Sequence, residues 1–202
     1  MCAVVSDFEQ ERLIESLEVF KIQGRDKYGR QILRVIGKFF PARILNVDVV
    51  KKYLEEKIFP SLEKRPFSVL YIHTNVEAAE NFPGISALKS IYNAIPVDVK
   101  NNLETVYFLH TGIQVRLYFA TFGCLIFTGG LYGKLKYVNR LSYLWDHVRR
   151  NEVEMPDFVY HHDEELDHRR MMDCGLESDH PRVCDAPWVE SPVAMYSMRS
   201  IP

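Results

Sequence analysis

Residues 105–138 read TVYFLHTGIQVRLYFATFGCLIFTGGLYGKLKYV, the most continuously apolar stretch of the chain. Its first part, residues 105–109, is rich in β-branched and aromatic side chains and predicts a buried strand. Residues 113–127 follow with Arg116 as their one charge, which makes them more uniformly apolar than a surface helix. The uncharged interval before Lys134 is shorter than the roughly 20 residues that span a bilayer. The pattern therefore predicts a helix that either belongs to the core or lines an apolar cavity.

Upstream of this stretch, the sequence predicts a short helix and then a hairpin. Ser6 and Glu9 form a capping-box pattern, and apolar residues follow at helical spacing. Two β-prone runs, residues 19–23 and 30–36, flank a turn that contains Gly24, Asp26 and Gly29.

The remaining periodic segments alternate between strand and helix. Residues 67–73 and 134–138 read as strands, and residues 85–95 and 141–148 read as helices. A further helix over residues 50–62 has Asn46 or Asp48 as its cap, and Pro60 should kink it or end it early. This alternation predicts an α/β fold with a mostly parallel sheet flanked by helices.

A single domain is expected over residues 1–166, with its core at about 20–166. From about residue 167 onward, prolines occur among polar residues without a sustained apolar period. Such a segment has little apolar surface to bury. Residues 167–202 are therefore predicted to be a disordered tail.

Composition narrows the class of protein. The formal net charge is -2, which gives no electrostatic reason to expect a nucleic-acid partner. The first residues lack a basic region followed by a long apolar core, so no signal peptide is predicted. The four cysteines share no metal-type spacing and read as reduced thiols. These features favour a cytoplasmic protein.

Common enzyme signatures are missing from the sequence. The pair Gly133-Lys134 does not complete a phosphate-binding P-loop, because Thr128 stands five residues earlier where that loop needs glycine. The tract around His161 and His162 is a charge run of the kind that is usually solvated, rather than a metal site. We therefore predict a protein that is not an enzyme and that holds neither metal nor cofactor.

Two predicted strands end in the same way, with His73-Thr74 and His110-Thr111. In a parallel sheet both histidines lie near the carboxyl edge, where ligands usually bind in open α/β sheets. They either orient a ligand or close the sheet edge through hydrogen bonds. The sequence leaves both interpretations open.

The order of these pieces resembles a CRAL-TRIO lipid-binding domain, in particular the divergent branch that includes the BCH domains. The resemblance runs from about residue 20 to 166 and is carried by five stretches in order: residues 24–30, 71–73, 100–110, 133–138 and 155–166. It implies that the helix at residues 113–126 is a gate over an apolar pocket. The implied activity is non-enzymatic binding, with intermembrane transfer, of a lipid or other hydrophobic molecule, which requires transient contact with a membrane surface.

The resemblance and the apolar stretch together predict the ligand-binding residues. They are Tyr71, His73, Phe108, His110, Leu117, Phe119, Phe122, Ile126 and Lys134. Lys134 matches the lysine of the family's phosphoinositide-transfer members, whereas Asn101 stands where those members carry a glutamate. Lys134, with His73 or His110, is expected to meet the polar end of the ligand.

An alternative follows from the same resemblance, because BCH-type relatives bind small GTPases and each other. In that case the chain is a protein-interaction module that binds a small GTPase or self-associates. The tail and the Lys51-Lys52 patch then matter more than the pocket.

Overall fold

The structure, a computed structural model, describes residues 5–62, 64–126 and 130–179, without the side chains of residues 122–126, 132 and 169–179. The chain divides into two compact units, Met1–Asp163 and Glu164–Pro202. The sheet, the helices that cover it and both cavities described below belong to the first unit.

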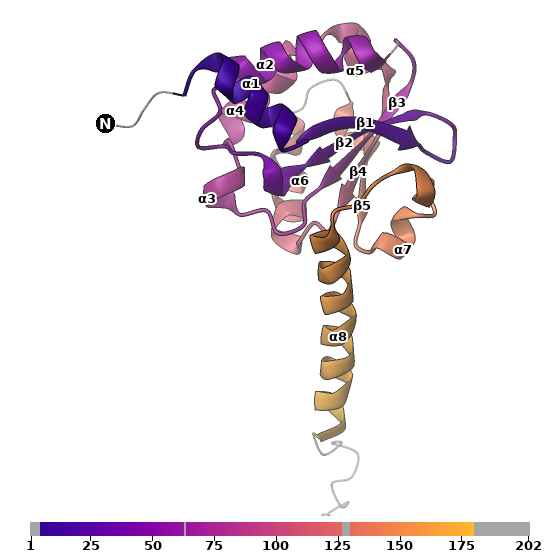
Figure 1. Ribbon diagram of the computed structural model, residues 1–202. Helices are drawn as coiled ribbons and strands as arrows, with labels where there is room; N and C mark the ends of the chain where they lie inside the picture. The colour runs from indigo at the N-terminus through magenta and orange to yellow at the C-terminus, as the bar shows by residue number, and fades with distance from the viewer. Residues whose placement is uncertain (1–4, 63, 127–129, 180–202) are drawn as a thin grey trace, which may run out of the picture. The chain divides into compact units, whose positions relative to one another are not determined.

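A five-stranded sheet forms the centre of the first unit (Figure 1), in the order β1-β2-β3-β4-β5. The strands are β1 (Phe20–Arg25), β2 (Gln31–Ile36), β3 (Phe67–Ile72), β4 (Leu103–Leu109) and β5 (Leu135–Val138). β1 pairs with β2 in antiparallel fashion, and every other neighbouring pair is parallel. The predicted α/β fold with a mostly parallel sheet is confirmed, and β3 and β4 are interior strands as expected for their continuous apolar runs.

Eight α-helices are found in the described residues. They are α1 (Asp7–Ser16), α2 (Val47–Tyr53), α3 (Ala78–Asn81), α4 (Ile85–Ala94), α5 (Val97–Asn102), α6 (Ile113–Ile126), α7 (Leu141–Leu144) and α8 (Asp157–Asp179). Because β2 to β5 lie side by side in chain order, right-handed crossovers place their connecting helices on one face of the sheet. In Figure 1, α2, α4 and α6 gather on that side and α7 lies on the other. We call the first side the helix face and the second the closed face.

The N-terminal predictions are confirmed. Ser6 Oγ accepts a hydrogen bond from the Glu9 amide at 3.3 Å, and Glu9 Oε2 accepts one from the Ser6 amide at 2.9 Å. This capping box starts α1, and β1 and β2 then form the predicted hairpin.

Asp26 fixes the hairpin turn against the rest of the sheet. Its carboxylate is fully buried and accepts hydrogen bonds from the amides of Tyr28 and Arg30, both at 2.9 Å. Arg30 Nε donates to the same group at 2.6 Å, and Ser68 Oγ of β3 donates at 2.9 Å. The carboxylate therefore joins the turn to the start of a central strand.

The helix that begins after Asn46 changes geometry near its end. Asn46 caps α2, and the chain then continues as a π-helical turn, η2 (Leu54–Ile58). The Phe59 amide donates to the Leu54 carbonyl at 2.8 Å, and Pro60 opens a short 3₁₀ turn, η3 (Pro60–Leu62). The early end predicted from Pro60 is thus observed, because proline has no amide hydrogen to continue the helix.

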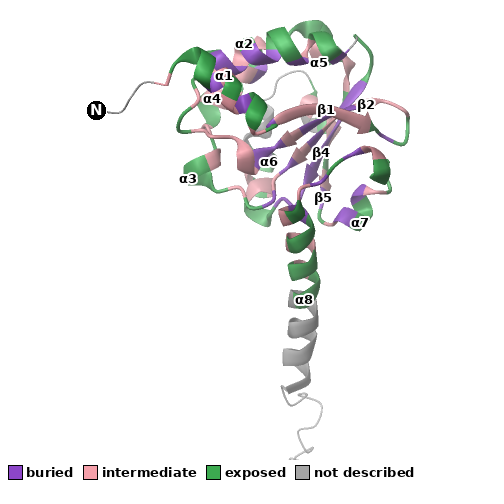
Figure 2. Ribbon diagram, viewed as in Figure 1, coloured by how far each residue is buried: buried purple, intermediate pink, exposed green. Residues whose placement is uncertain are grey.

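The closed face is a packed apolar core. Its strand residues occupy alternate positions, and they are Ile32, Ile36, Leu70, Ile72, Tyr107, Leu109 and Val138. The chain after β5 covers them with Leu141, Leu144, Val148, Val153, Met155 and Val159. Figure 2 shows these buried residues concentrated on the strands and on the inner side of the segments that cover them.

Some segments differ from the prediction. The helix expected over residues 141–148 is shorter, because only Leu141–Leu144 is α-helical. α3, α5 and α8 were not predicted, and α8 extends from Asp157 to Asp179, past the expected start of the tail at residue 167. Residues 180–202 lie outside the described part of the chain.

Candidate functional site

The helix face of the sheet holds a cavity of about 520 Å³, which we call the inner cavity. Its floor is made by β2 to β5 and its walls by α4, α5 and the 3₁₀ turn η4 (Leu131–Lys134). The lining residues are mainly apolar: Leu33, Phe59, Phe67, Val69, Tyr71, Tyr92, Ile95, Val97, Val99, Lys100, Asn101, Leu103, Val106, Phe108, Leu131, Lys134 and Leu135. Small-molecule sites commonly have volumes of about 300–1,000 Å³ and an apolar lining with few polar groups.

Aromatic rings form the centre of the cavity floor. Phe108 lies 5.1 Å from Tyr71 and 5.4 Å from Phe119, measured between ring centroids. Burial raises the pKa of Tyr71 to about 12, so its hydroxyl stays protonated at neutral pH. A methyl group added at Gly37 would lie 2.5 Å from that hydroxyl oxygen, which explains why this position has no side chain. The floor is therefore closely packed around Tyr71 and uncharged.

Lys134 and Lys100 are the charged residues in the described lining of the inner cavity, and Lys100 lies over the ring of Tyr92. Lys134 is partly buried, and its Nζ donates a hydrogen bond to the carbonyl of Leu103 at the start of β4. Within the described residues, Lys134 has no carboxylate partner. An ammonium group has three hydrogens, so donors remain for a ligand.

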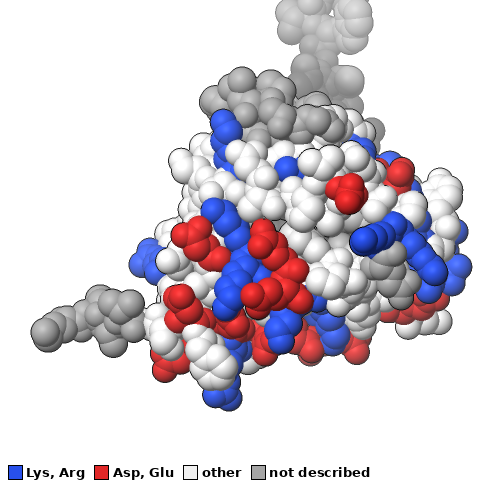
Figure 3. Space-filling view, turned by 90° about the horizontal axis from the view of Figure 1, so that it is seen from above, with Lys and Arg blue, Asp and Glu red and all other residues white. Residues whose placement is uncertain are grey.

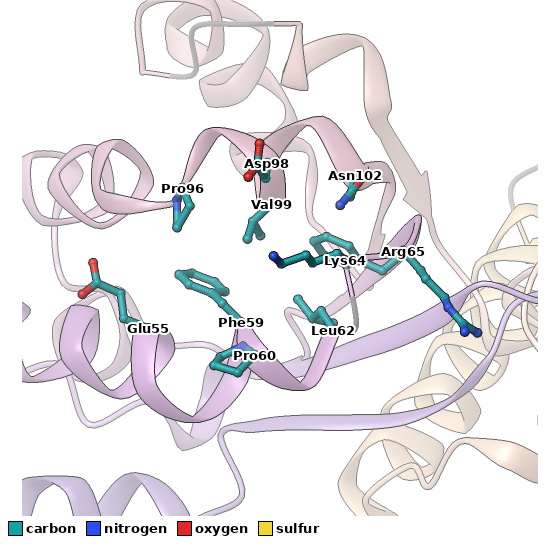
Figure 4. Close-up of a pocket in the computed structure, with 11 residues that line it drawn as sticks. Glu55, Phe59, Pro60, Leu62, Lys64, Arg65, Pro96, Asp98, Val99 and Asn102 are labelled. Atoms are coloured by element: carbon teal, nitrogen blue, oxygen red, sulfur yellow. The ribbon is translucent and has the colours of Figure 1, made fainter.

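A second cavity of about 350 Å³ adjoins the first, and we call it the outer pocket (Figure 4). The two share the side chains of Phe59, Phe67 and Val99. The rest of its lining carries more charge: Glu55, Pro60, Leu62, Lys64, Arg65, Pro96, Asp98 and Asn102. The two cavities therefore adjoin across the three shared side chains, and the outer pocket, at the amino edge of the sheet, is the more polar of the two.

The predicted histidines do not lie near Lys134. His73 and His110 follow the ends of β3 and β4, whereas Lys134 precedes the start of β5. In a parallel sheet these are opposite edges, separated by roughly 20 Å along a seven-residue strand. Neither histidine lines the inner cavity or the outer pocket. The structure thus brings Tyr71, Phe108 and Lys134 together and separates the histidines from Lys134.

His110 belongs to a hydrogen-bonded chain at the carboxyl edge. Its side chain is fully buried, with Nδ1 2.9 Å from Thr74 Oγ1 and Nε2 3.0 Å from Asp163 Oδ1. The Leu141 amide also donates to Asp163 Oδ1, at 3.1 Å. Burial lowers the pKa of His110, opposed by the hydrogen bond to Asp163. This arrangement matches the sheet-closing alternative considered from the sequence.

His73 is half-buried, and its ring centroid lies 5.8 Å from that of Tyr71. Burial lowers its pKa. In the described part of the chain, its Nδ1 atom is buried without a hydrogen-bond partner. His73 therefore contacts the aromatic floor from the side, beyond the cavity lining.

The described side chains of helix α6 differ in how far they are exposed to solvent. Phe119 is buried against Phe108, whereas Ile113 and Leu117 are 84% and 63% exposed. None of the described side chains of α6 lines the inner cavity. The side chains of Phe122 and Ile126 lie outside the described residues, so the gate role of α6 stays a prediction.

Several cavity residues were missed in the sequence. They are Leu33, Val69, Val106 and Leu135 on the strands, and Tyr92, Ile95, Val97, Val99 and Leu131 on the walls. Val69 and Val106 could have been found by alternation, because each lies two residues before Tyr71 or Phe108 on the same strand. Leu33 and Leu135 also required the register that pairs them with Val69 and Val106. Tyr92 and Ile95 lie on the predicted helix over residues 85–95, whereas Val97, Val99 and Leu131 had no comparable signal, since α5 and η4 are short.

The two lysines of the Lys51-Lys52 patch each pair with a carboxylate of the chain. Lys51 pairs with Asp48 and Lys52 with Glu11, each at 3.0 Å. Figure 3 shows acidic and basic side chains interleaved on that side of the molecule. Among the described residues, no cluster of three His, Cys, Asp or Glu side chains fits a metal ion. No described helix has the length and hydropathy required to cross a bilayer.

The sheet order, the apolar cavity on the helix face and the covering helices define an α/β domain with a cavity of small-ligand size. The model of the Divergent CRAL/TRIO domain matches residues 29–165, and the chain belongs to that family. At family level this indicates binding of a lipid or another small ligand.

Among known proteins, the chain is similar to ganglioside-induced differentiation-associated protein 2. The human protein is 26% identical over 153 residues, which cover 74% of this chain and 30% of that protein. The protein from Macaca fascicularis gives the same identity with 32% of its length covered. The Drosophila melanogaster protein named GDAP2 homolog is 24% identical, with 69% of this chain and 25% of that protein covered. The chain therefore spans a third or less of the length of these relatives.

Proposed function

We propose that this chain binds a lipid or other small hydrophobic molecule in the inner cavity, without catalysing its conversion, and exchanges it with a membrane surface. The observation that carries the proposal is a cavity of about 520 Å³ on the helix face, with an aromatic floor and few polar groups. The family to which the chain belongs adds support.

The cavity lining favours an apolar ligand on energetic grounds. Burial of an alkyl chain is worth about 0.8 kcal/mol per CH₂. The floor around Tyr71 and Phe108 offers no unpaired carboxylate, and its tyrosine is neutral. A long chain therefore gains enough free energy to offset the cost of its ordering.

Exchange with a membrane is the second part of the proposal. Helix α6 exposes Ile113 and Leu117 one turn apart, and it has no acidic residue in its first turn. An apolar helix surface of this kind favours transient contact with lipid. We propose that α6 contacts the membrane during uptake and release of the ligand.

Filling the cavity tests the first part of the proposal. Val106 lines the inner cavity, and Val106→Phe should occupy it with an apolar ring. Uptake of a fluorescent fatty acid should fall at least about tenfold, because the space for the chain is lost. Val47→Phe makes the same change on α2, away from both cavities, and should leave uptake unchanged. Equal uptake by both variants and by the unaltered chain would refute the cavity as the binding site.

Lys134 is proposed to contact the polar end of the ligand. Its ammonium lies in the cavity without a carboxylate partner among the described residues. Lys134→Ala should weaken anionic phospholipids about threefold to tenfold more than a neutral lipid of the same chain, as measured by vesicle exchange. Equal losses for the two lipids would contradict the role given to Lys134.

Native mass spectrometry of the freshly purified chain also tests the alternative of a protein-interaction module. The proposal expects a bound lipid on the monomer mass. A self-associated or partner-bound species with an empty cavity would instead favour the module.

A further inference from the structure

The outer pocket is bounded by charges of both signs that do not pair with one another. Within the described residues, Glu55, Lys64 and Asp98 have no ion-pair partner. On the neighbouring helices, by contrast, Lys57 pairs with Glu15 at 3.7 Å and Lys52 with Glu11 at 3.0 Å. Unpaired charges of both signs thus gather around one cavity.

The backbone holds Lys64 in an uncommon conformation. Its φ of +52° lies in the left-handed region, which non-glycine residues seldom occupy. Figure 4 shows its side chain extending across the pocket toward Phe59 and Val99, while Arg65 points away. Strain of this kind is retained where the surrounding structure specifies it, and it is concentrated at functional sites.

Phe59 lies between the outer pocket and the inner cavity. It follows the π-helical turn η2, a geometry that often marks functional sites, and its ring lines both cavities. Pro60 and Pro96 stand on opposite sides of the pocket and stiffen its rim. An elongated molecule that passes the Phe59 ring would place one end in each cavity.

The charges around the outer pocket indicate which head group a ligand would need in order to bind there. Lys64 attracts an anion, but Glu55 and Asp98 oppose a head that carries only negative charge. A head with both a phosphate and an ammonium group satisfies both signs, and the Phe59 ring favours the cation. A head without charge leaves all three groups solvated and gains nothing from them.

We propose that the outer pocket is a subsite for a zwitterionic phosphate–ammonium head, whose apolar chain occupies the inner cavity and whose ester linkage, the inner end of the polar part, lies against Lys134. Lys64 contacts the phosphate, and Glu55, with Asp98, contacts the ammonium. This proposal rests on the proposed function, because it assumes that the inner cavity holds the chain.

Calorimetric titration of the full chain with matched ligands tests the proposal. Lysophosphatidylcholine, lysophosphatidic acid and a fatty alcohol of equal chain length are compared below their micelle concentrations. Glycerophosphocholine supplies the head without the chain. We expect lysophosphatidylcholine to bind most tightly and glycerophosphocholine at least about a hundredfold more weakly, because it lacks the buried chain.

Two pairs of variants identify the groups that contact the head. Lys64→Ala should weaken lysophosphatidylcholine about threefold, as for the loss of an exposed ionic contact, with no change for the fatty alcohol. Glu55→Gln should weaken the same ligand to a similar extent and strengthen lysophosphatidic acid. Lys57→Ala and Glu56→Gln are the matched controls. They remove one positive and one negative charge from the π-helical turn that holds Glu55, outside both cavities. They should change the affinity for neither lysophosphatidylcholine nor lysophosphatidic acid.

The outcomes separate the two proposals. If the fatty alcohol and lysophosphatidylcholine bind equally well, and Lys64→Ala and Glu55→Gln change nothing, the subsite is refuted while the inner cavity stands. If glycerophosphocholine binds as tightly as lysophosphatidylcholine, the pocket takes a free zwitterion, and its assignment as the head subsite of a lipid is wrong. If none of the three chain-bearing ligands binds, the proposed function fails and the subsite fails with it.

Discussion

The two faces of the sheet use the same strands for different purposes. Alternate residues of β3 point to opposite faces, so Leu70 and Ile72 pack in the closed face while Val69 and Tyr71 line the inner cavity. On the closed face, Leu144 and Val148 fill the space above the strands and are fully buried. On the helix face, the inner cavity remains between the strands and the helices. The packed core and the proposed ligand cavity thus lie on opposite sides of a single sheet.

The largest loss of stability should come from removing the carboxylate of Asp26, which anchors the hairpin turn to β3 on the closed face. Asp26→Ala removes a buried carboxylate that holds Arg30, Ser68 and two turn amides. Loss of one partner of a buried ion pair costs about 3 to 5 kcal/mol of unfolding free energy. Ser68→Ala, which removes one hydrogen bond, should cost about 1 kcal/mol. Equilibrium denaturation measures both, and equal losses would contradict the anchor.

An identical substitution on each face should sharpen the comparison. Leu144→Ala on the closed face should cost about 3 kcal/mol, because it leaves a void in a packed core. Leu135→Ala, beside the inner cavity, should cost about 1 kcal/mol, since that side chain is half-buried and already borders empty space. Urea denaturation with an unchanged slope would give both values. A larger loss for Leu135→Ala would mean that the helix face is the main source of stability.

The smallest expected effect is a pH dependence of stability that arises from His110 at the carboxyl edge of the sheet. A carboxylate only accepts hydrogen bonds, so the neutral His110 ring is assigned its hydrogen on Nε2, toward Asp163, and Nδ1 accepts from Thr74. The pKa of His110 is lowered by burial, despite the hydrogen bond to Asp163 and with further lowering from His162 and Arg140. The unfolded chain therefore binds more protons, and stability is full above about pH 6.5 and falls as pH decreases through the folded pKa.

Thermal unfolding between pH 7.5 and pH 5 measures this dependence. His110→Gln should flatten the pH dependence of the melting temperature, whereas His161→Gln, at an exposed position of α8, should leave it unchanged. His73, whose pKa burial also lowers, accounts for a remaining slope. If His110→Gln leaves the pH dependence of the melting temperature unchanged, protonation of His110 is not coupled to folding.

Much of the fold could be predicted because its signals are local. The capping box at Ser6 and the apolar runs of β3 and β4 each lie within a few residues. α8 escaped prediction because its sequence is polar on all sides and shows no apolar stripe.

The candidate site was predictable only in part. Tyr71, Phe108 and Lys134 were assigned to the ligand, and all three line the inner cavity. The separation of His110 from Lys134 could have been inferred, since one follows its strand and the other precedes its own. The outer pocket has no such signal, because it joins residues 55–67 to residues 96–102 through tertiary packing alone.

The cover of the closed face has a consequence for biosynthesis. All five strands are complete at Val138, but the residues that cover their second side continue to Val159. At 5–20 residues per second, a ribosome adds these last residues in about one to four seconds. During that interval the closed face of the nascent sheet is exposed, and the helices on the opposite face cannot cover it. A chaperone that binds the emerging chain would be most useful at this moment, and a truncation within residues 141–159 should yield a polypeptide that aggregates rather than one that folds less stably.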